Sequence, residues 1–161
     1  MADNTGKKTI ILFSGDMDKV LAAFVIANGM AAMGDDVTMF FTFWALNVLR
    51  KEKPPKTSGK SLNQRMFARM MPTGPDKLRM SNMNFAGVGP RMMKKVMREQ
   101  HVMSIAELIA TAREQEIKMM ACTMSMDVMG LKAEELIDGL EFVGVASYLG
   151  EADEANVNLF I

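Results

Sequence analysis

The first third of the chain alternates between short apolar runs and one longer segment with helical periodicity. Lys8–Ser14 is a compact apolar run that ends in a turn, and Val37–Phe41 is a second short run. Both have the length and composition of strands buried in a parallel sheet. The segment between them has helical spacing, and Ser14 or Asp16 is placed to cap it. We therefore predict one parallel βαβ unit, whose helix carries Val20, Leu21, Phe24 and Ala27 on its apolar face.

The same alternation returns in the last third of the chain. Ser104 and Glu107 have the spacing of a capping box, which predicts the start of a helix. A strand is expected at residues 116–121, and Cys122 follows it directly. About five strands that alternate with helices predict an α/β fold with a mostly parallel sheet. The remaining expected elements are a helix at 132–137, a strand at 141–143, a helix at 145–149 or slightly beyond, and a last strand at 157–160.

The middle of the chain, at about residues 54–102, lacks this order. The run from Pro54 to Lys60 has the composition of a loop. Methionine-rich helices are expected at Asn63–Met71 and Arg91–Gln100, and the glycines and proline at 87–90 predict a break before the second one. A stretch of this length is long for a connection between strands. We therefore treat residues 1–161 as one α/β domain with a helical insertion that serves as a lid or an oligomerisation arm.

Composition narrows the classes of function. The 161 residues include 19 Lys and Arg and 19 Asp and Glu, so the net charge is zero. Nucleic-acid binding needs a cationic surface, and this balance argues against it. No unbroken apolar run reaches the roughly 20 residues of a membrane-spanning helix, and the first residues do not have the pattern of a signal peptide. The single cysteine cannot form an internal disulfide, which favours a reducing cytoplasm.

Two further features of the composition concern metals and cofactors. The 19 methionines include clusters at 66–71 and 92–97, which are either soft copper(I) ligands or flexible residues of an interface. We favour the interface. His101, the only histidine, lies at the end of a basic helix, where a cation is favourable. One histidine and one cysteine cannot form a zinc cluster within the chain, and we expect neither a metal nor another cofactor.

The segment Met119–Gly130 holds the candidate chemistry, because an apolar run gives way there to small polar residues around Cys122. A thiol reacts as its thiolate, and the unpaired N–H groups at the start of a helix stabilise that anion. We expect the sulfur to face the N–H groups of Thr123, Met124 and Ser125, with the Thr123 or Ser125 hydroxyl as a further donor. The alternative is a buried, inert cysteine that packs as a small hydrophobe. Spacing alone leaves both interpretations open.

Residues that follow the predicted strands are candidates for the rim of a pocket beside Cys122. In open α/β sheets, ligands bind at the carboxyl ends of the strands. For the Thr42–Leu49 segment we favour the alternative, an apolar helix face that packs on the sheet. The candidates are Gly15 and Asp16 after the first strand, Phe43, Trp44 and Asn47 after the second, and Gly144 after the fourth.

Three blocks of the sequence resemble the DsrE/DsrF-like superfamily, in its DsrE2-type branch. They are Cys122–Gly130 (Cys-Thr-Met-Ser-Met-Asp-Val-Met-Gly), Phe40–Arg50, and the ending formed by Gly144–Leu149 and Asn156–Ile161. The resemblance covers nearly the whole chain, and it implies a flavodoxin-like three-layer α/β sandwich that forms homo-oligomers. It also implies that Cys122 accepts sulfane sulfur as a persulfide and transfers it to a partner, such as a TusA-like or rhodanese-like protein.

Members of this branch are often labelled peroxiredoxin-like, and the sequence argues against that label. It has no resolving cysteine and lacks the Thr-x-x-Cys pattern that a peroxiredoxin uses. The leading prediction is therefore a sulfur-relay protein with sulfurtransferase activity. Two alternatives remain, a non-catalytic interaction subunit with an inert cysteine and a flavodoxin-type module that binds a flavin, nucleotide or other small ligand. The Ser14–Lys19 turn matches neither a Walker A loop nor G-x-G-x-x-G, so a nucleotide has little support.

Overall fold

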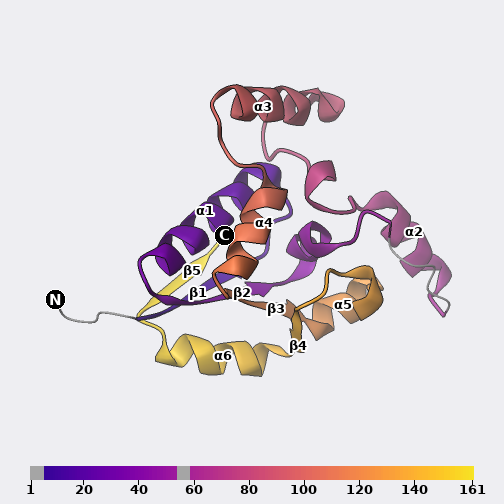
Figure 1. Ribbon diagram of the computed structural model, residues 1–161. Coiled ribbons are helices and arrows are strands. Elements are labelled where there is room, and N and C mark those ends of the chain that lie inside the picture. Colours follow the sequence, from indigo (N-terminus) through magenta and orange to yellow (C-terminus); the bar gives the residue numbers. More distant parts are fainter. Residues whose placement is uncertain (1–5, 54–58) are drawn as a thin grey trace.

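The computed structural model describes residues 6–53 and 59–161 and contains one five-stranded sheet in which every pairing is parallel. The strand order is β4-β3-β2-β1-β5 (Figure 1). The predicted α/β fold with a mostly parallel sheet of about five strands is confirmed. The strands are β1 (Lys7–Leu12), β2 (Asp36–Phe41), β3 (Lys118–Cys122), β4 (Glu141–Val143) and β5 (Val157–Phe160).

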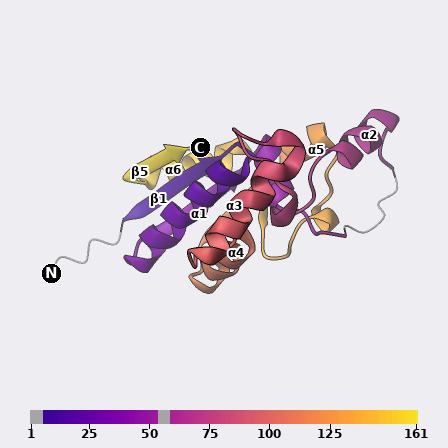
Figure 2. The same ribbon diagram turned by 90° about the horizontal axis from the view of Figure 1, so that it is seen from above.

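Helices cover the sheet on both faces, which gives the three layers of a flavodoxin-like sandwich. Helices α1 (Met17–Ala32) and α4 (Ile105–Glu114) lie on one face, and α6 (Val145–Glu154) lies on the other (Figure 2). The topology explains this division. The chain steps from β1 to β4 in one direction and then returns to place β5 on the other side of β1. Because such crossovers are right-handed, the returning helix must lie on the opposite face.

The larger core fills the space between the sheet and the pair α1 and α4. Alternate residues of the central strands point into it, including Ile10 and Leu12 of β1 and Met39 and Phe41 of β2. The Phe24 ring of α1 packs on that of Phe41, with 5.9 Å between the centroids. The intervening residues of the strands face α6, where a smaller core forms from Phe40, Met120, Cys122 and Tyr148.

The starts of the two helices over the larger core differ in how they are capped. At α4 the predicted capping box is present, with the Ser104 hydroxyl accepting from the N–H of Glu107. Hydrogen bonds from Ser104 lower the pKa of the Glu107 carboxyl. At α1 the predicted side-chain cap is wrong. Asp16 occupies the N-cap position without such a bond, because its carboxylate accepts from the Ser14 hydroxyl and pairs with Lys19.

The segment between β2 and β3 contains the short helices that the sequence predicts only in part. Ser61 caps the start of helix α2 and forms a capping box with Gln64, a signal that the prediction overlooked. The helix α3 starts at Val88, within the predicted break at 87–90, because proline is tolerated in the first turn of a helix. Gly89 is required there, since a Cβ atom would lie 1.8 Å from the Met83 carbonyl oxygen. The elements are η1 (Phe43–Leu49), α2 (Leu62–Met70), η2 (Pro75–Lys77), η3 (Phe85–Gly87) and α3 (Val88–Glu99).

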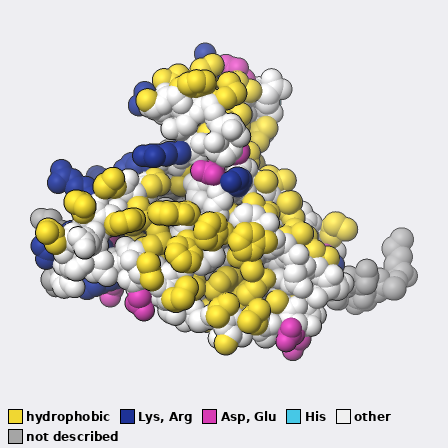
Figure 3. All heavy atoms as spheres, turned by 180° about the vertical axis from the view of Figure 1, so that it is seen from behind, with side chains coloured by type: hydrophobic (Ala, Val, Ile, Leu, Met, Phe, Trp, Pro, Cys, Tyr) yellow, Lys and Arg dark blue, Asp and Glu magenta, His cyan; other side chains and the backbone are white. Residues whose placement is uncertain are grey.

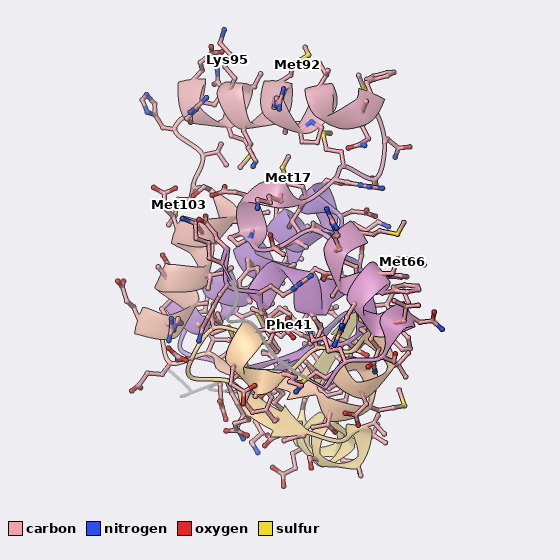
Figure 4. All side chains as sticks on the ribbon, turned by 90° about the vertical axis from the view of Figure 1, so that its right-hand side faces the viewer. Met17, Phe41, Met66, Met92, Lys95 and Met103 are labelled. Atoms are coloured by element: carbon pink, nitrogen blue, oxygen red, sulfur yellow. The ribbon has the colours of Figure 1, made fainter. Side chains whose placement is uncertain are left out.

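The predicted loop from Pro54 to Lys60 lies mostly outside the described residues. Helix α3 stands apart from the sheet, and the side chains of Met92 and Lys95 point away from the rest of the molecule (Figure 4). On its inner side, Met97 is buried and Lys94 pairs with Asp76 at 3.5 Å.

After β3 the chain forms α5 (Thr123–Met129) and then only a single turn, η4 (Ala133–Glu135). The predicted helix at 132–137 is therefore wrong. The backbone groups that would continue it pair with the end of η1 instead. The N–H of Ile137 donates to the carbonyl of Leu49, and the N–H of Lys51 donates to the carbonyl of Glu135.

A buried ionic cluster holds this turn in place. The Glu135 carboxylate accepts from the Lys60 ammonium at 2.6 and 2.7 Å, and the Arg50 guanidinium lies 4.0 Å away. Arg50 also donates to the carbonyls of Ala68 and Pro72. Burial lowers the pKa of Arg50, and the charge of Glu135 opposes that shift. The cluster thus joins η1, η4 and the segment around α2.

Replacing Glu135 with Ala should destabilise the protein strongly, because two buried cations lose their counter-charge. We expect the free energy of unfolding to fall by about 3–5 kcal/mol. The matched control is Glu134→Ala, which removes the exposed neighbouring carboxylate and should change it by no more than about 0.5 kcal/mol. Urea unfolding followed by circular dichroism measures both. Equal midpoints for the two variants would contradict this role of the cluster.

Candidate functional site

Cys122 lies at the junction that the sequence predicts, as the last residue of β3 and the residue that precedes α5. Side chains alternate along β3, so Met119 and Ala121 face the larger core while Met120 and Cys122 face α6. The Cys122 side chain is only 3% exposed. The fold therefore delivers the thiol to the carboxyl edge of the sheet, beneath α6.

The thiol is enclosed by apolar side chains from three elements. Phe40 of β2 and Tyr148 of α6 stack with 4.8 Å between their ring centroids. The Tyr148 hydroxyl pairs with that of Thr9 on β1, at 3.0 Å between the oxygens. Val143 at the end of β4 packs against the same cluster. Tyr148 is thus part of the same cluster as the thiol, and a hydrogen bond holds its side chain against the sheet.

Ion pairs one turn further along α6 also attach this helix to the sheet. The Lys118 ammonium donates to the Glu151 carboxylate at 2.7 Å, and Lys7 lies 3.5 Å from the same carboxylate. This hydrogen bond raises the pKa of Lys118 and lowers the pKa of Glu151. These pairs are partly exposed, so each contributes little stability by itself.

The residues expected to stabilise the sulfur anion use their hydroxyls elsewhere. The Thr123 hydroxyl donates to the carbonyl of Val143 at 3.3 Å, and the Ser125 hydroxyl pairs with that of Thr42 at 2.8 Å. Met124 is exposed, and the Cys122 side chain makes no capping hydrogen bond with the first turn of α5. The backbone N–H groups in the first turn of α5 are therefore the hydrogen-bond donors for an anion near Cys122.

The residues expected at the pocket rim divide between two places. Gly15, Asp16, Trp44 and Asn47 line one cleft over the carboxyl ends of β1 and β2, and Cys122 is not among the residues that line it. The other two candidates lie elsewhere. The Phe43 ring packs on Phe13, with 5.5 Å between centroids, and Gly144 precedes α6. In the Thr42–Leu49 segment, residues 45–49 are buried as the packing alternative predicts, while Trp44 stays 45% exposed.

Sequence reasoning missed the side chains that surround the thiol. A signal for two of them existed in the alternation along the strands, since Phe40 and Met120 are register partners and share a face with Cys122. Tyr148 had no comparable signal, because its contact with Phe40 joins residues that are distant in the sequence.

The described residues offer neither a metal site nor a membrane-spanning helix. They include no group of three or more His, Cys, Asp or Glu side chains arranged to hold a metal ion. His101 is exposed just after α3. No helix in the described part of the chain is long and apolar enough to cross a membrane.

Residues 4–160 match the model of the DsrE/DsrF/DrsH-like family. The chain belongs to this family. It is 51% identical to YrkE of Bacillus subtilis (strain 168) over the full length of both proteins. It is 36% identical to the sulfur carrier protein DsrE2 of Allochromatium vinosum, with 96% of this chain and 98% of that one aligned. The resemblance to DsrE/DsrF-like proteins of the DsrE2 type is therefore confirmed.

Solved structures share the fold of this family member at low sequence identity. The ychN protein from E. coli superimposes with a TM-score of 0.54 at 13% identity, over 96% of this chain and 99% of that one. The protein MTH1491 from Methanobacterium thermoautotrophicum gives 0.58 at 12% identity, over 97% and 99%. These likenesses support the flavodoxin-like α/β architecture.

Removing the Tyr148 side chain should expose the thiol. In Tyr148→Ala we expect native Cys122 to react severalfold faster with a thiol reagent such as dithiodipyridine, because the ring that covers the cluster is lost. Leu149→Ala, one position along α6 and already exposed, is the matched control and should label at the wild-type rate. Circular dichroism establishes that each variant is folded. Identical rates in both variants would show that Tyr148 does not cover the sulfur.

Proposed function

We propose that this protein is a sulfur-relay protein that carries sulfane sulfur as a persulfide on Cys122. The observation that carries the proposal is the 36% identity, over almost the whole chain, to a protein named as a sulfur carrier. The sequence offers one thiol for such a task, and it lies at the carboxyl edge of the sheet. A chain with one cysteine can hold sulfur but cannot close an internal disulfide cycle.

The transfer step is an exchange at sulfur and needs no external oxidant. The Cys122 thiolate attacks the outer sulfur of a donor persulfide, a new S–S bond forms, and the old S–S bond breaks. The electron pair leaves on the donor thiolate, which takes up a proton from water. The N–H groups of Thr123, Met124 and Ser125 are the candidates to stabilise the terminal sulfur anion. Transfer to the acceptor is the same step in reverse.

The burial of Cys122 means that the donor must gain access before it reacts. The contacts that close the site run through α6, namely the Tyr148 stack on Phe40 and the Glu151 pairs. Movement of this one helix would uncover the thiol without opening the larger core. A partner that displaces α6 would couple docking to sulfur transfer. We expect donor or acceptor proteins of the TusA-like or rhodanese-like kind, in a reducing cytoplasm where a lone thiol persists.

The same burial favours a second candidate, a non-catalytic interaction subunit whose cysteine is inert. A free cysteine in an apolar cluster commonly packs as a small hydrophobe. The two functions differ in one property of the native protein, which is whether Cys122 accepts sulfur while the fold is intact.

Incubation of the native protein with sodium tetrasulfide should add one or more sulfur atoms to Cys122. Intact-mass spectrometry should show the gain in wild type, and dithiothreitol should remove it. Cys122→Ser should gain nothing, because it lacks the only thiol. If wild type gains sulfur only after unfolding in urea, the interaction subunit is the correct function and the relay is not.

We also propose that the protein forms homo-oligomers through the face of the sheet that α6 leaves incompletely covered. Phe160 of β5 is 69% exposed, and its ring lies 6.1 Å from that of Phe13, which follows β1. Figure 3, which views the molecule from behind, shows a broad patch of hydrophobic side chains. Apolar fields of this kind mark interaction sites, since water is a poor solvent for them.

Phe160→Asp should weaken this association, because a charge would be buried in the apolar contact. Sedimentation velocity should show a shift of the variant toward a smaller species at equal concentration. Met33→Asp is the matched control, because Met33 is 84% exposed at the end of α1, away from this face, and should sediment as wild type does. A wild-type protein that sediments as a monomer at all concentrations would refute self-association.

A further inference from the structure

The cleft at the carboxyl ends of β1 and β2 has the form of a binding site separate from the thiol. It encloses about 660 Å³, within the range of pockets for small organic ligands. The loop after β1 and the η1 turn form one wall, and the methionine-rich helix α2 forms the other. The apolar lining consists of Phe13, Trp44, Met66, Phe67, Met70, Met71 and Pro72.

A buried amide in the wall of this cleft lacks a partner. Asn47 is only 1% exposed, and its Oδ1 atom receives no hydrogen bond from any described residue. Its main chain is fixed, because the Asn47 carbonyl accepts from the N–H of Gly74 at 3.0 Å. Buried polar groups are almost always paired, since an unpaired one costs stability. An unpaired amide in a cleft therefore points to a ligand that supplies the missing N–H or O–H group.

The charges at the rim favour an anion. Lys19 and Asp16 neutralise each other in an ion pair at 3.2 Å. The Arg79 side chain also lines the cleft, is exposed, and has no ion-pair partner within residues 6–53 and 59–161. Its carbonyl accepts from the N–H of Met17, which fixes its main chain at the start of α1. The guanidinium thus remains available for a carboxylate, sulfonate or phosphate.

The two loops that form one wall of the cleft pack closely through their backbones. A Cβ atom on Gly15 would lie 2.7 Å from the Trp44 carbonyl oxygen, so the two loops touch through main-chain atoms. Phe43, the residue before Trp44, has a φ of 47°, which a bulky residue rarely adopts. Strained backbone of this kind is concentrated at ligand sites. These constraints fix the position of Trp44 at the mouth of the cleft.

We propose that this cleft binds a small organic anion with an aromatic or otherwise apolar body and a hydrogen-bond donor. The donor pairs with the Asn47 carboxamide, the anionic group pairs with Arg79, and the body packs against Trp44 and Phe67. The site is independent of sulfur transfer at Cys122. It also gives a role to α2 of the methionine-rich insertion, as the wall of a ligand site.

Anilinonaphthalene sulfonate tests the proposal, because it combines two aromatic groups, an N–H donor and an anion. Trp44 is the only tryptophan, so its fluorescence reports on the cleft directly. We expect one probe per chain to quench Trp44. Asn47→Leu keeps the size of the side chain and should weaken binding about tenfold or more. Arg79→Gln is exposed, so folding is not threatened, and it should weaken binding most at low salt.

Three matched variants and one further measurement complete the test. Lys95→Gln on α3, Phe160→Asp on the apolar sheet face and Cys122→Ser should all bind the probe as wild type does. Without the probe, Asn47→Leu should unfold at the wild-type temperature or above it, because the buried Oδ1 atom that it removes has no hydrogen bond from any described residue. Wild-type affinity in both Asn47→Leu and Arg79→Gln, or a loss confined to Phe160→Asp, would overturn the proposal. So would a lower unfolding temperature of Asn47→Leu, which would make the amide structural.

Discussion

The need to cover both faces of a parallel sheet governs this structure. Helices α1 and α4 bury the central strands on one face, whereas α6 alone covers the other face. Two consequences follow from this imbalance. Cys122 is buried in the small core to which Tyr148 of α6 contributes, and Phe13 and Phe160 remain exposed because no second helix of the described residues lies beside α6. The burial of the thiol and the exposed apolar surface thus both result from the single helix on this face of the sheet.

The proposed sulfur relay requires access to the buried thiol, and the contacts that attach α6 to the sheet lie in that single helix. Tyr148 and Glu151 lie on α6. Their side chains form hydrogen bonds with Thr9 of β1 and Lys118 of β3, which are distant from them in the sequence. The larger core contains none of these contacts, so movement of α6 would leave it intact. Elements that move are expected to come from the less stable part of a fold, and a single helix on a small core fits that expectation.

The carboxyl edge of the sheet carries two chemically different places. At the end of β3, an apolar cluster encloses one thiol. At the ends of β1 and β2, a cleft combines aromatic rings with an amide oxygen and a guanidinium that have no partner among the described residues. Both lie at the edge of the sheet where open α/β folds bind their ligands. The Thr42–Ser125 hydroxyl pair links the loop after β2 to α5, and it is a physical connection between the two places.

The sequence by itself determined the strands, the principal helices and the junction at Cys122. Apolar periodicity and capping residues are local, so the pattern of Lys8–Ser14 and the Ser104–Glu107 box could be predicted from neighbours in the chain. Only the tertiary structure decided which side chains meet. Tyr148 joins the cluster that contains Cys122, the hydroxyls of Thr123 and Ser125 bond to other partners, and four of the six rim candidates lie together away from the thiol. The physical reason is that each of these outcomes depends on strand order and on the face to which a helix returns. No local pattern encodes either of these.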